Sequence, residues 1–335
     1  MTEKINMTPY QKRYGNPDTP NPEFQPNELM EQILGRKTIR RFSNKKLPPG
    51  LLDMLVACAQ SAPTSSMGKS WSVIALETNY EKERFKEAAG WPLSYSDPNN
   101  TLAYDECAVF LIFLADNYKI AKSIEMLGKG EVPESDGFWP RHIPGTPTVK
   151  APHPDRPDEI FDVEGHIKWL DQTYYDVRAI MDATIAAQTV VICAESVGLG
   201  TMYMGSISHC EHKSFVEVLN LPERTYPIFG LCIGYPPEAG TDSMGYIPLN
   251  KDYIPWVEKT ASSLVKPRQP KEIVLFRGAY NKEVGHWLRL YNSITIRWGK
   301  EVNRAVDWFG TKCVARIKLV TDQLKKMKDM GNGWK

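Results

Sequence analysis

The sequence lacks the motifs of several common enzyme classes. It contains no G-x-G-x-x-G, no Walker phosphate loop, no G-x-S-x-G and no H-E-x-x-H. The first two motifs cradle the phosphates of dinucleotides and nucleotides, the third presents a hydrolase nucleophile and the fourth binds zinc. We therefore do not expect a dinucleotide-fold enzyme, a nucleotide hydrolase, a serine hydrolase or a metalloprotease of these types.

Long apolar runs and an excess of one charge are also absent. No stretch of about 18 apolar residues occurs, and the polar residues 1–27 lack the apolar core of a signal peptide, so we expect no membrane association. The 41 Lys and Arg nearly balance the 40 Asp and Glu among 335 residues, giving a net charge of +1. This balance gives no reason to expect a nucleic-acid partner. We predict a globular cytoplasmic protein.

Paired cysteines are missing as well. None of the six cysteines forms the C-x-x-C spacing of a zinc ribbon or a redox dithiol. Residues 209–212 read His-Cys-Glu-His, and all of these residue types can bind zinc. Adjacent residues rarely converge on one ion without further ligands, so we interpret this run as a polar loop leading into a helix. We expect no metal site.

Helical and strand patterns follow one another along the chain. Apolar residues at helical spacing predict helices over about 27–34, 49–62, 176–197 and 211–219, and a mainly helical tail over 283–330. Apolar runs predict strands over 71–76, 107–114, 201–204 and 228–233. The helix over 176–197 is apolar nearly all round, so we expect it to be buried in the centre of the fold and closed by Gly198.

Three parts of the chain look irregular. Residues 1–26 are polar and rich in proline, which suits an extended arm better than a helix. The remainder, 27–335, reads as one domain with a helical C-terminal extension and two inserts, at about 128–165 and 237–265. The first insert is too rich in proline for a helix or a sheet, and loops of that length are usually functional or disordered.

Four segments carry groups that could contact a ligand. In the basic run 36–42, an extended backbone would turn Arg36, Thr38 and Arg40 toward one ligand, although a cationic surface run is equally consistent with the sequence. The hydroxyl-rich loop 62–71 offers several donors to a planar polar ligand, or forms a turn that satisfies its own backbone.

The other two segments lie later in the chain. Glycines in 198–206 would let the backbone pass close to a flat group, or would simply end the preceding helix. Lys266 and Arg268 form a fork suited to a phosphate, or a solvated basic turn. Each segment alone leaves both interpretations open.

Together these segments resemble the nitroreductase superfamily of FMN enzymes. The similarity is to its subgroup of oxygen-insensitive NADPH nitroreductases and NADPH:FMN oxidoreductases. The matching segments occur in one order over most of residues 28–270, apart from the two inserts: 36–42, Ser65-Ser66, Trp71, 182–188, 194–200, 221–222, 229–236 and 266–270.

The resemblance implies a homodimer with an α+β fold, in which helices wrap a mixed, mainly antiparallel sheet and FMN binds at the dimer interface. Arg36 and Thr38 would meet the FMN phosphate together with Lys266 and Arg268, and Lys37 belongs to the same predicted site. Arg40 would lie near N1 and the C2 carbonyl of the flavin, where an arginine would stabilise the negative charge of the reduced ring.

The remaining predicted contacts come from two loops. Ser65 and Ser66 would come from a loop that faces the partner subunit, and Lys69 would supply positive charge where the family loop often carries an amide. The ring near N5 would be lined by residues 203–206, with the Gly205 amide able to bond the flavin. These four residues are Tyr203, Met204, Gly205 and Ser206.

The implied activity is hydride transfer from NADPH or NADH, by a ping-pong route, to a small planar electron-poor acceptor such as a nitroaromatic, a quinone or a flavin. Because flavin N5 carries the hydride, we expect no catalytic side chain. Phe138 or Trp139 of the first insert would roof the substrate pocket. The alternatives are a specialised FMN-dependent dehalogenase or dehydrogenase of the same superfamily, and a flavin carrier or sensor without turnover.

Overall fold

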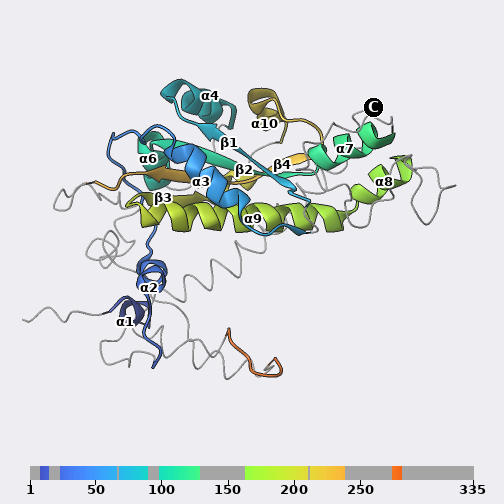
Figure 1. Cartoon of the computed structure of the whole chain (residues 1–335). Helices are drawn as coiled ribbons and strands as arrows, with labels where there is room; N and C mark the ends of the chain where they lie inside the picture. Colours follow the sequence, from blue (N-terminus) through green and yellow to red (C-terminus); the bar gives the residue numbers. More distant parts are fainter. Residues whose placement is uncertain are drawn as a thin grey trace, which may run out of the picture. The chain divides into compact units, whose positions relative to one another are not determined.

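The computed structural model describes residues 8–14, 23–65, 68–89, 98–128, 163–209, 212–237 and 274–280. The chain divides into two compact units. The first contains residues 1–38 and 248–330, and the second contains 39–247 with 331–335. The second unit contains all four described strands and is drawn in Figure 1 together with the first.

The first unit begins with a short helix where the sequence predicts an extended arm. Helix α1 spans Pro9–Tyr14. The Thr8 N–H donates to Gln11 Oε1 (2.9 Å) and the Gln11 N–H donates to Thr8 Oγ1 (3.2 Å), which is a capping box with proline at the first helical position. The extended-arm prediction is wrong for this stretch because Pro9 stands where a helix tolerates proline best.

Helix α2 (Glu28–Gly35) follows in the same unit and starts as predicted. The Asn27 side chain accepts a hydrogen bond from the Met30 N–H (3.0 Å), and two acidic residues occupy the first turn. The buried Arg13 of α1 donates to the backbone oxygens of Leu34 (2.7 Å) and Arg36. Arg13 therefore ties α1 to the carbonyl end of α2.

The second unit is built on a four-stranded sheet in the order β1-β2-β4-β3. Its three strand pairings are all antiparallel. All four predicted strands are confirmed, and the first has the predicted bounds, 71–76. The strands are β1 (Trp71–Leu76), β2 (Val109–Asp116), β3 (Gly200–Met204) and β4 (Thr225–Gly234).

Helices cover both faces of this sheet, which explains why every residue of the central strand β2 is buried (Figure 1). Phe110, Ile112 and Leu114 alternate onto one face and pack under three helices. These are α4 (Asn79–Ala89), α6 (Pro98–Glu106) and α10 (His212–Leu219).

The opposite face carries Leu111 and Phe113 of β2. It packs against α3 (Leu51–Gln60) and the long helix α9 (Thr173–Ser196). Two further helices, α7 (Tyr118–Gly128) and α8 (Val163–Leu170), form a smaller cluster with the start of α9. The helical prediction over 283–330 and most of both predicted inserts lie outside the described residues.

Alanines allow α9 to lie close to the sheet. Five alanines of the helix have no exposed surface, and Gly198 ends the helix with a φ of 80°, as predicted. Glycine suits this position because L-residues rarely adopt such a φ. The buried alanines are Ala179, Ala183, Ala186, Ala187 and Ala194.

The prediction that α9 is buried all round is wrong. Tyr174, Val177, Met181 and Ile185 are between 39% and 61% exposed and recur every three or four residues, so they form one stripe along the helix. The sheet covers only one side of α9, so the apolar residues on the other side are left at the surface. We call these four residues the α9 stripe.

Helix α9 is also the one described helix whose length and composition would suit a membrane span, with a mean hydropathy of 1.5 over its most apolar window. In the fold, 44% of that window is buried. A helix that covers a sheet needs the same apolar composition, so the packing of α9 accounts for it.

Candidate functional site

Residues 39–42 of the basic run pass beside strand β3. The Ile39 N–H donates to the Thr201 carbonyl (3.0 Å), and the side chains of Ile39 and Phe42 are buried in the core. A Cβ at Gly200 would lie 2.7 Å from Cγ1 of Ile39, so only glycine permits this close approach. Arg40 is thereby placed next to β3.

The two arginines of this segment have different environments. Arg41 Nε lies 2.9 and 2.8 Å from the carboxylate oxygens of Glu106 on α6, and this hydrogen bonding raises the pKa of the guanidinium. Glu106 also accepts from the Phe42 N–H (3.0 Å), so Arg41 and Glu106 fasten the segment to the fold. The buried Nε of Arg40 has no hydrogen-bond partner among the described residues, so this donor is unsatisfied there.

Strand β3 leads into the second predicted ligand segment. The Tyr203 ring stands edge-on to Phe229, and its hydroxyl lies 3.4 Å from Gln188 Oε1 of α9. Met204 as a whole is 1% exposed, so neither its side chain nor its backbone presents surface to a ligand. Gly205 opens a 3₁₀ turn (Gly205–His209), and a Cβ there would meet nothing within 4 Å. The space beside Gly205 is open.

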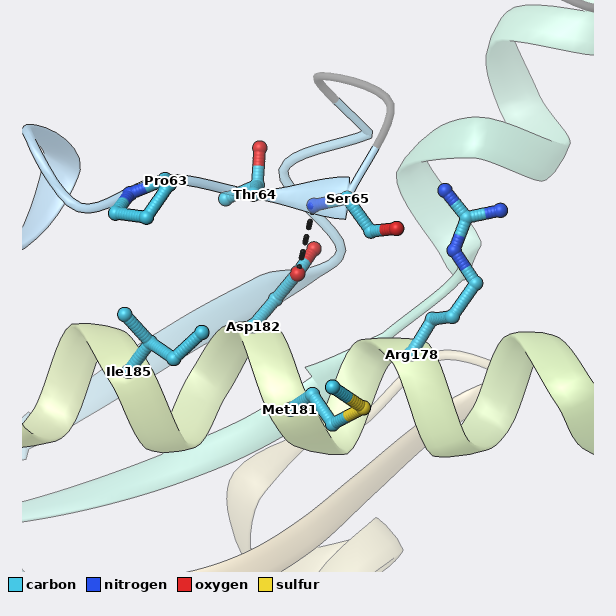
Figure 2. Close-up of a pocket in the computed structure, with 7 residues that line it drawn as sticks. All are labelled: Pro63, Thr64, Ser65, Arg178, Met181, Asp182 and Ile185. Atoms are coloured by element: carbon cyan, nitrogen blue, oxygen red, sulfur yellow. Dashed lines mark hydrogen bonds between the residues drawn. The ribbon is translucent and has the colours of Figure 1, made fainter. Parts of the chain in front are cut away.

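The hydroxyl-rich loop lies between α3 and β1 and rests on α9. The Ser65 N–H donates to Oδ1 of Asp182 (2.9 Å), as Figure 2 shows. Within the loop, the Gly68 N–H donates to the Ser65 carbonyl (2.9 Å) and the Lys69 N–H donates to Thr64 Oγ1 (3.4 Å). Lys69 has a φ of 47°, a left-handed conformation that is strained for a lysine.

A cavity of about 270 Å³ lies between this loop and α9 (Figure 2). Asp182 is 2% exposed, and its Oδ2 has no hydrogen-bond partner among the described residues. The sequence analysis gives Asp182 no role, although an acidic residue within an alanine-rich helix signals a buried polar contact. The cavity is lined by Pro63, Thr64, Ser65, Arg178, Met181, Asp182 and Ile185.

The two candidate segments of the second unit lie at opposite edges of the sheet. The Ser65 loop leads into β1 and the Gly205 turn follows β3, so three strand spacings, or roughly 14 Å, separate the edge strands. Both segments contact α9, one through Asp182 and the other through Gln188. The exposed stripe of α9 therefore passes beside the Ser65 loop, where Met181 and Ile185 line the same cavity as Ser65, and it ends before Gln188.

The remaining predicted site residues belong to the first unit or lie outside the described part of the chain. Arg36, Lys37 and Thr38 belong to the first unit. Their implied roles stay predictions, as do those of the residues outside the described part of the chain. The latter are Ser66, Phe138, Trp139, Lys266 and Arg268.

The chemistry available at these segments is binding and orientation. Across the described ranges, no group of three or more His, Cys, Asp or Glu side chains could hold a metal ion. The second unit offers a guanidinium, an ammonium, hydroxyls and backbone amides. Such donors bind a polar or anionic group, and open space at a glycine accommodates a flat one.

Comparison with known proteins defines the family. The model of the nitroreductase family matches residues 33–235, which is more than half of the chain. The chain belongs to the nitroreductase family. This confirms the resemblance inferred from the sequence, and it agrees with the α+β architecture of the second unit.

Individual relatives are similar over most of the chain. An FMN reductase (NADPH) of Bacillus subtilis is 28% identical over 76% of this chain and 75% of the relative. An NADPH-dependent oxidoreductase of Staphylococcus epidermidis is 25% identical over 89% of this chain and 95% of the relative. The structure of the NfrA1 nitroreductase from B. subtilis superimposes with a TM-score of 0.61 at 24% identity, covering 90% of this chain and 98% of that one.

Proposed function

We propose that the protein passes hydride from NADPH or NADH, by a ping-pong route through bound FMN, to a small planar electron-poor acceptor such as a nitroaromatic, a quinone or a flavin. The observation that carries this proposal is the buried Arg40 Nε, which lacks a partner among the described residues and lies beside β3. In a nitroreductase-family chain, this cation suits the flavin edge that becomes negative on reduction.

The enzyme class and the cofactor rest on the family and on the named relatives. The family match and the relatives named FMN reductase (NADPH) and NADPH-dependent oxidoreductase confirm the predicted class, an FMN-dependent NAD(P)H oxidoreductase. Bound FMN would supply the hydride-transfer chemistry between the nicotinamide and the acceptor. The acceptor class and the ping-pong order are the finer parts of the proposal.

The described residues fit FMN. Arg40 would donate to the N1 and C2 edge of the ring and stabilise negative charge there. The open space beside Gly205 leaves room for the ring, and the Gly205 amide would donate to it. Ser65 and Lys69 are both exposed, so the hydroxyl and the ammonium can reach the polar side chain of the cofactor. None of these groups transfers a proton; they bind and orient.

We further propose a homodimer in which each cofactor site takes residues from both chains. The α9 stripe is an exposed apolar surface of the kind that marks interfaces, and a two-fold axis would pair it with itself. Because the Ser65 loop lies beside Met181 and Ile185 of this stripe, such pairing would bring the loop of each chain close to the other chain. We also propose that the protein acts in the cytoplasm, where NADPH and NADH are available as donors.

Placing charge on the stripe should separate the chains. The double variant Val177→Lys, Ile185→Lys should sediment as one chain where the original protein sediments as two, because four lysines would face one another across the two-fold axis. Sedimentation equilibrium measures the mass. Tyr80→Lys on α4, another exposed apolar residue, is the control and should leave the dimer intact. A double variant that stays dimeric would place the interface elsewhere.

Arg40 and Arg41 form a matched pair for testing the cofactor contact. Arg40→Gln should weaken FMN binding about tenfold or more and make the flavin midpoint potential more negative, because a charged hydrogen bond to the ring is lost. Arg41→Gln should instead lower the free energy of unfolding by about 1 kcal/mol and leave the potential unchanged, because its partner is Glu106. Fluorescence titration, spectroelectrochemistry and thermal unfolding measure these effects. Equal potentials in both variants would contradict the assignment of Arg40.

The activity itself is tested by following the flavin spectrum. Under anaerobic conditions NADPH should bleach the flavin band of the FMN-loaded protein, and a nitroaromatic added afterwards should restore it. Initial rates at varied NADPH and acceptor should give parallel double-reciprocal lines, as a ping-pong route requires. A protein that binds no FMN would overturn the proposal. Bound FMN that neither NADPH nor NADH bleaches would indicate a flavin carrier.

A further inference from the structure

Among its described residues, the hydroxyl-rich loop is held by few hydrogen bonds. Two of its hydrogen bonds, Gly68 to Ser65 and Lys69 to Thr64, join residues of the loop to one another. At its C-terminal end the loop is held by strand β2, because the Asp116 N–H donates to the Ser70 carbonyl (2.9 Å). In the described part of the loop before Gly68, the Ser65 N–H donates to the Asp182 side chain. This hydrogen bond connects the loop to helix α9.

The loop also stores strain. Lys69 holds a left-handed φ of 47°, which costs a non-glycine residue on the order of 1 kcal/mol. A strained backbone persists only where surrounding contacts determine it. The contact from Ser65 to Asp182 is one of those that oppose relaxation of the loop.

Asp182 is an unusual residue for its position. It is 2% exposed on the side of α9 that also buries Ala183 and Ala186, and burial of a carboxylate is costly unless hydrogen bonds compensate. Oδ1 accepts one hydrogen bond, from Ser65, while Oδ2 has no partner among the described residues. Figure 2 shows the Asp182 carboxylate at the edge of the cavity, with its hydrogen bond to the Ser65 N–H of the loop.

We infer that Asp182 is a positioning residue for the cofactor site. Its carboxylate fixes the backbone at Ser65 and so holds the Ser65 hydroxyl in the position from which it would meet FMN. This inference rests on the proposed function, and it assigns to Asp182 no contact with the reacting atoms. One oxygen acceptor at the position of Oδ1 is sufficient for the role.

Two substitutions of Asp182 separate the effect of losing the hydrogen-bond acceptor from the effect of losing the negative charge. Asp182→Asn keeps an oxygen that can accept from the Ser65 N–H, whereas Asp182→Ala removes it. Ser196→Ala, at the far end of α9, is the control because its hydroxyl bonds only to the Cys193 carbonyl of the same helix in the described contacts. Melting temperature, amide hydrogen exchange at Ser65 and the FMN dissociation constant are measured for all four proteins.

We expect Asp182→Ala to speed exchange at the Ser65 amide and to weaken FMN binding about tenfold, since one hydrogen bond to a charged acceptor is lost. The exchange rate is measured without FMN and so reports on the loop itself. Asp182→Asn should restore both values to near those of the original protein, and Ser196→Ala should change neither. All variants should stay folded, with melting temperatures within a few degrees, because the substitution also removes a buried carboxylate.

Two results would overturn the inference. Asp182→Ala with unchanged exchange and unchanged FMN affinity would show that the loop does not depend on Asp182. An Asn variant as impaired as the Ala variant in both measurements would show that the acceptor is not what matters. If the original protein binds no FMN, the proposed function fails, whereas the exchange measurement still reports whether Asp182 holds the loop.

Discussion

The close packing of α9 on the sheet is the constraint on which the second unit depends. Alanines on the inner side of the helix let it approach the strands, so the residues beside them are fixed relative to the sheet. Asp182 contacts the loop before β1, and Gln188 contacts the strand β3 that precedes Gly205. One rigid helix therefore sets the spacing of both candidate ligand segments, while its outer side is left apolar and exposed.

The two arginines of segment 39–42 have different roles: Arg41 stabilises the fold, and Arg40 is proposed to bind the cofactor. Arg41 forms a salt bridge with Glu106. This contact and the burial of Ile39 and Phe42 hold residues 39–42 against the core of the second unit. Arg40 lies between these anchors, so its position is defined although its Nε has no partner among the described residues. A side chain held in place by its neighbours is preorganised, which lowers the entropic cost of binding a cofactor.

Sequence patterns predicted the elements better than the contacts between them. The apolar runs located all four strands, and glycine at 198 located the end of α9, because both depend on local sequence. The proline content of residues 1–26 predicts an extended arm, but the capping pair Thr8 and Gln11 starts a short helix at Pro9. The exposed side of α9 and the contact of Asp182 with Ser65 could not be predicted, because burial depends on tertiary packing and the contact joins residues 117 positions apart. Lys69 is a similar case: the adjacent Gly68 would be expected to take the left-handed φ, yet Lys69 takes it.

The central claim is that FMN binds against segments 39–41, 64–69 and 203–206. Amide hydrogen exchange of the full chain with and without FMN tests it most directly, because it reports binding at each segment independently of turnover. The account predicts that FMN slows exchange at the loop before β1 and at the turn after β3, with little change in α4, which covers the other face of the sheet. FMN that binds but leaves both of those segments unchanged would contradict it.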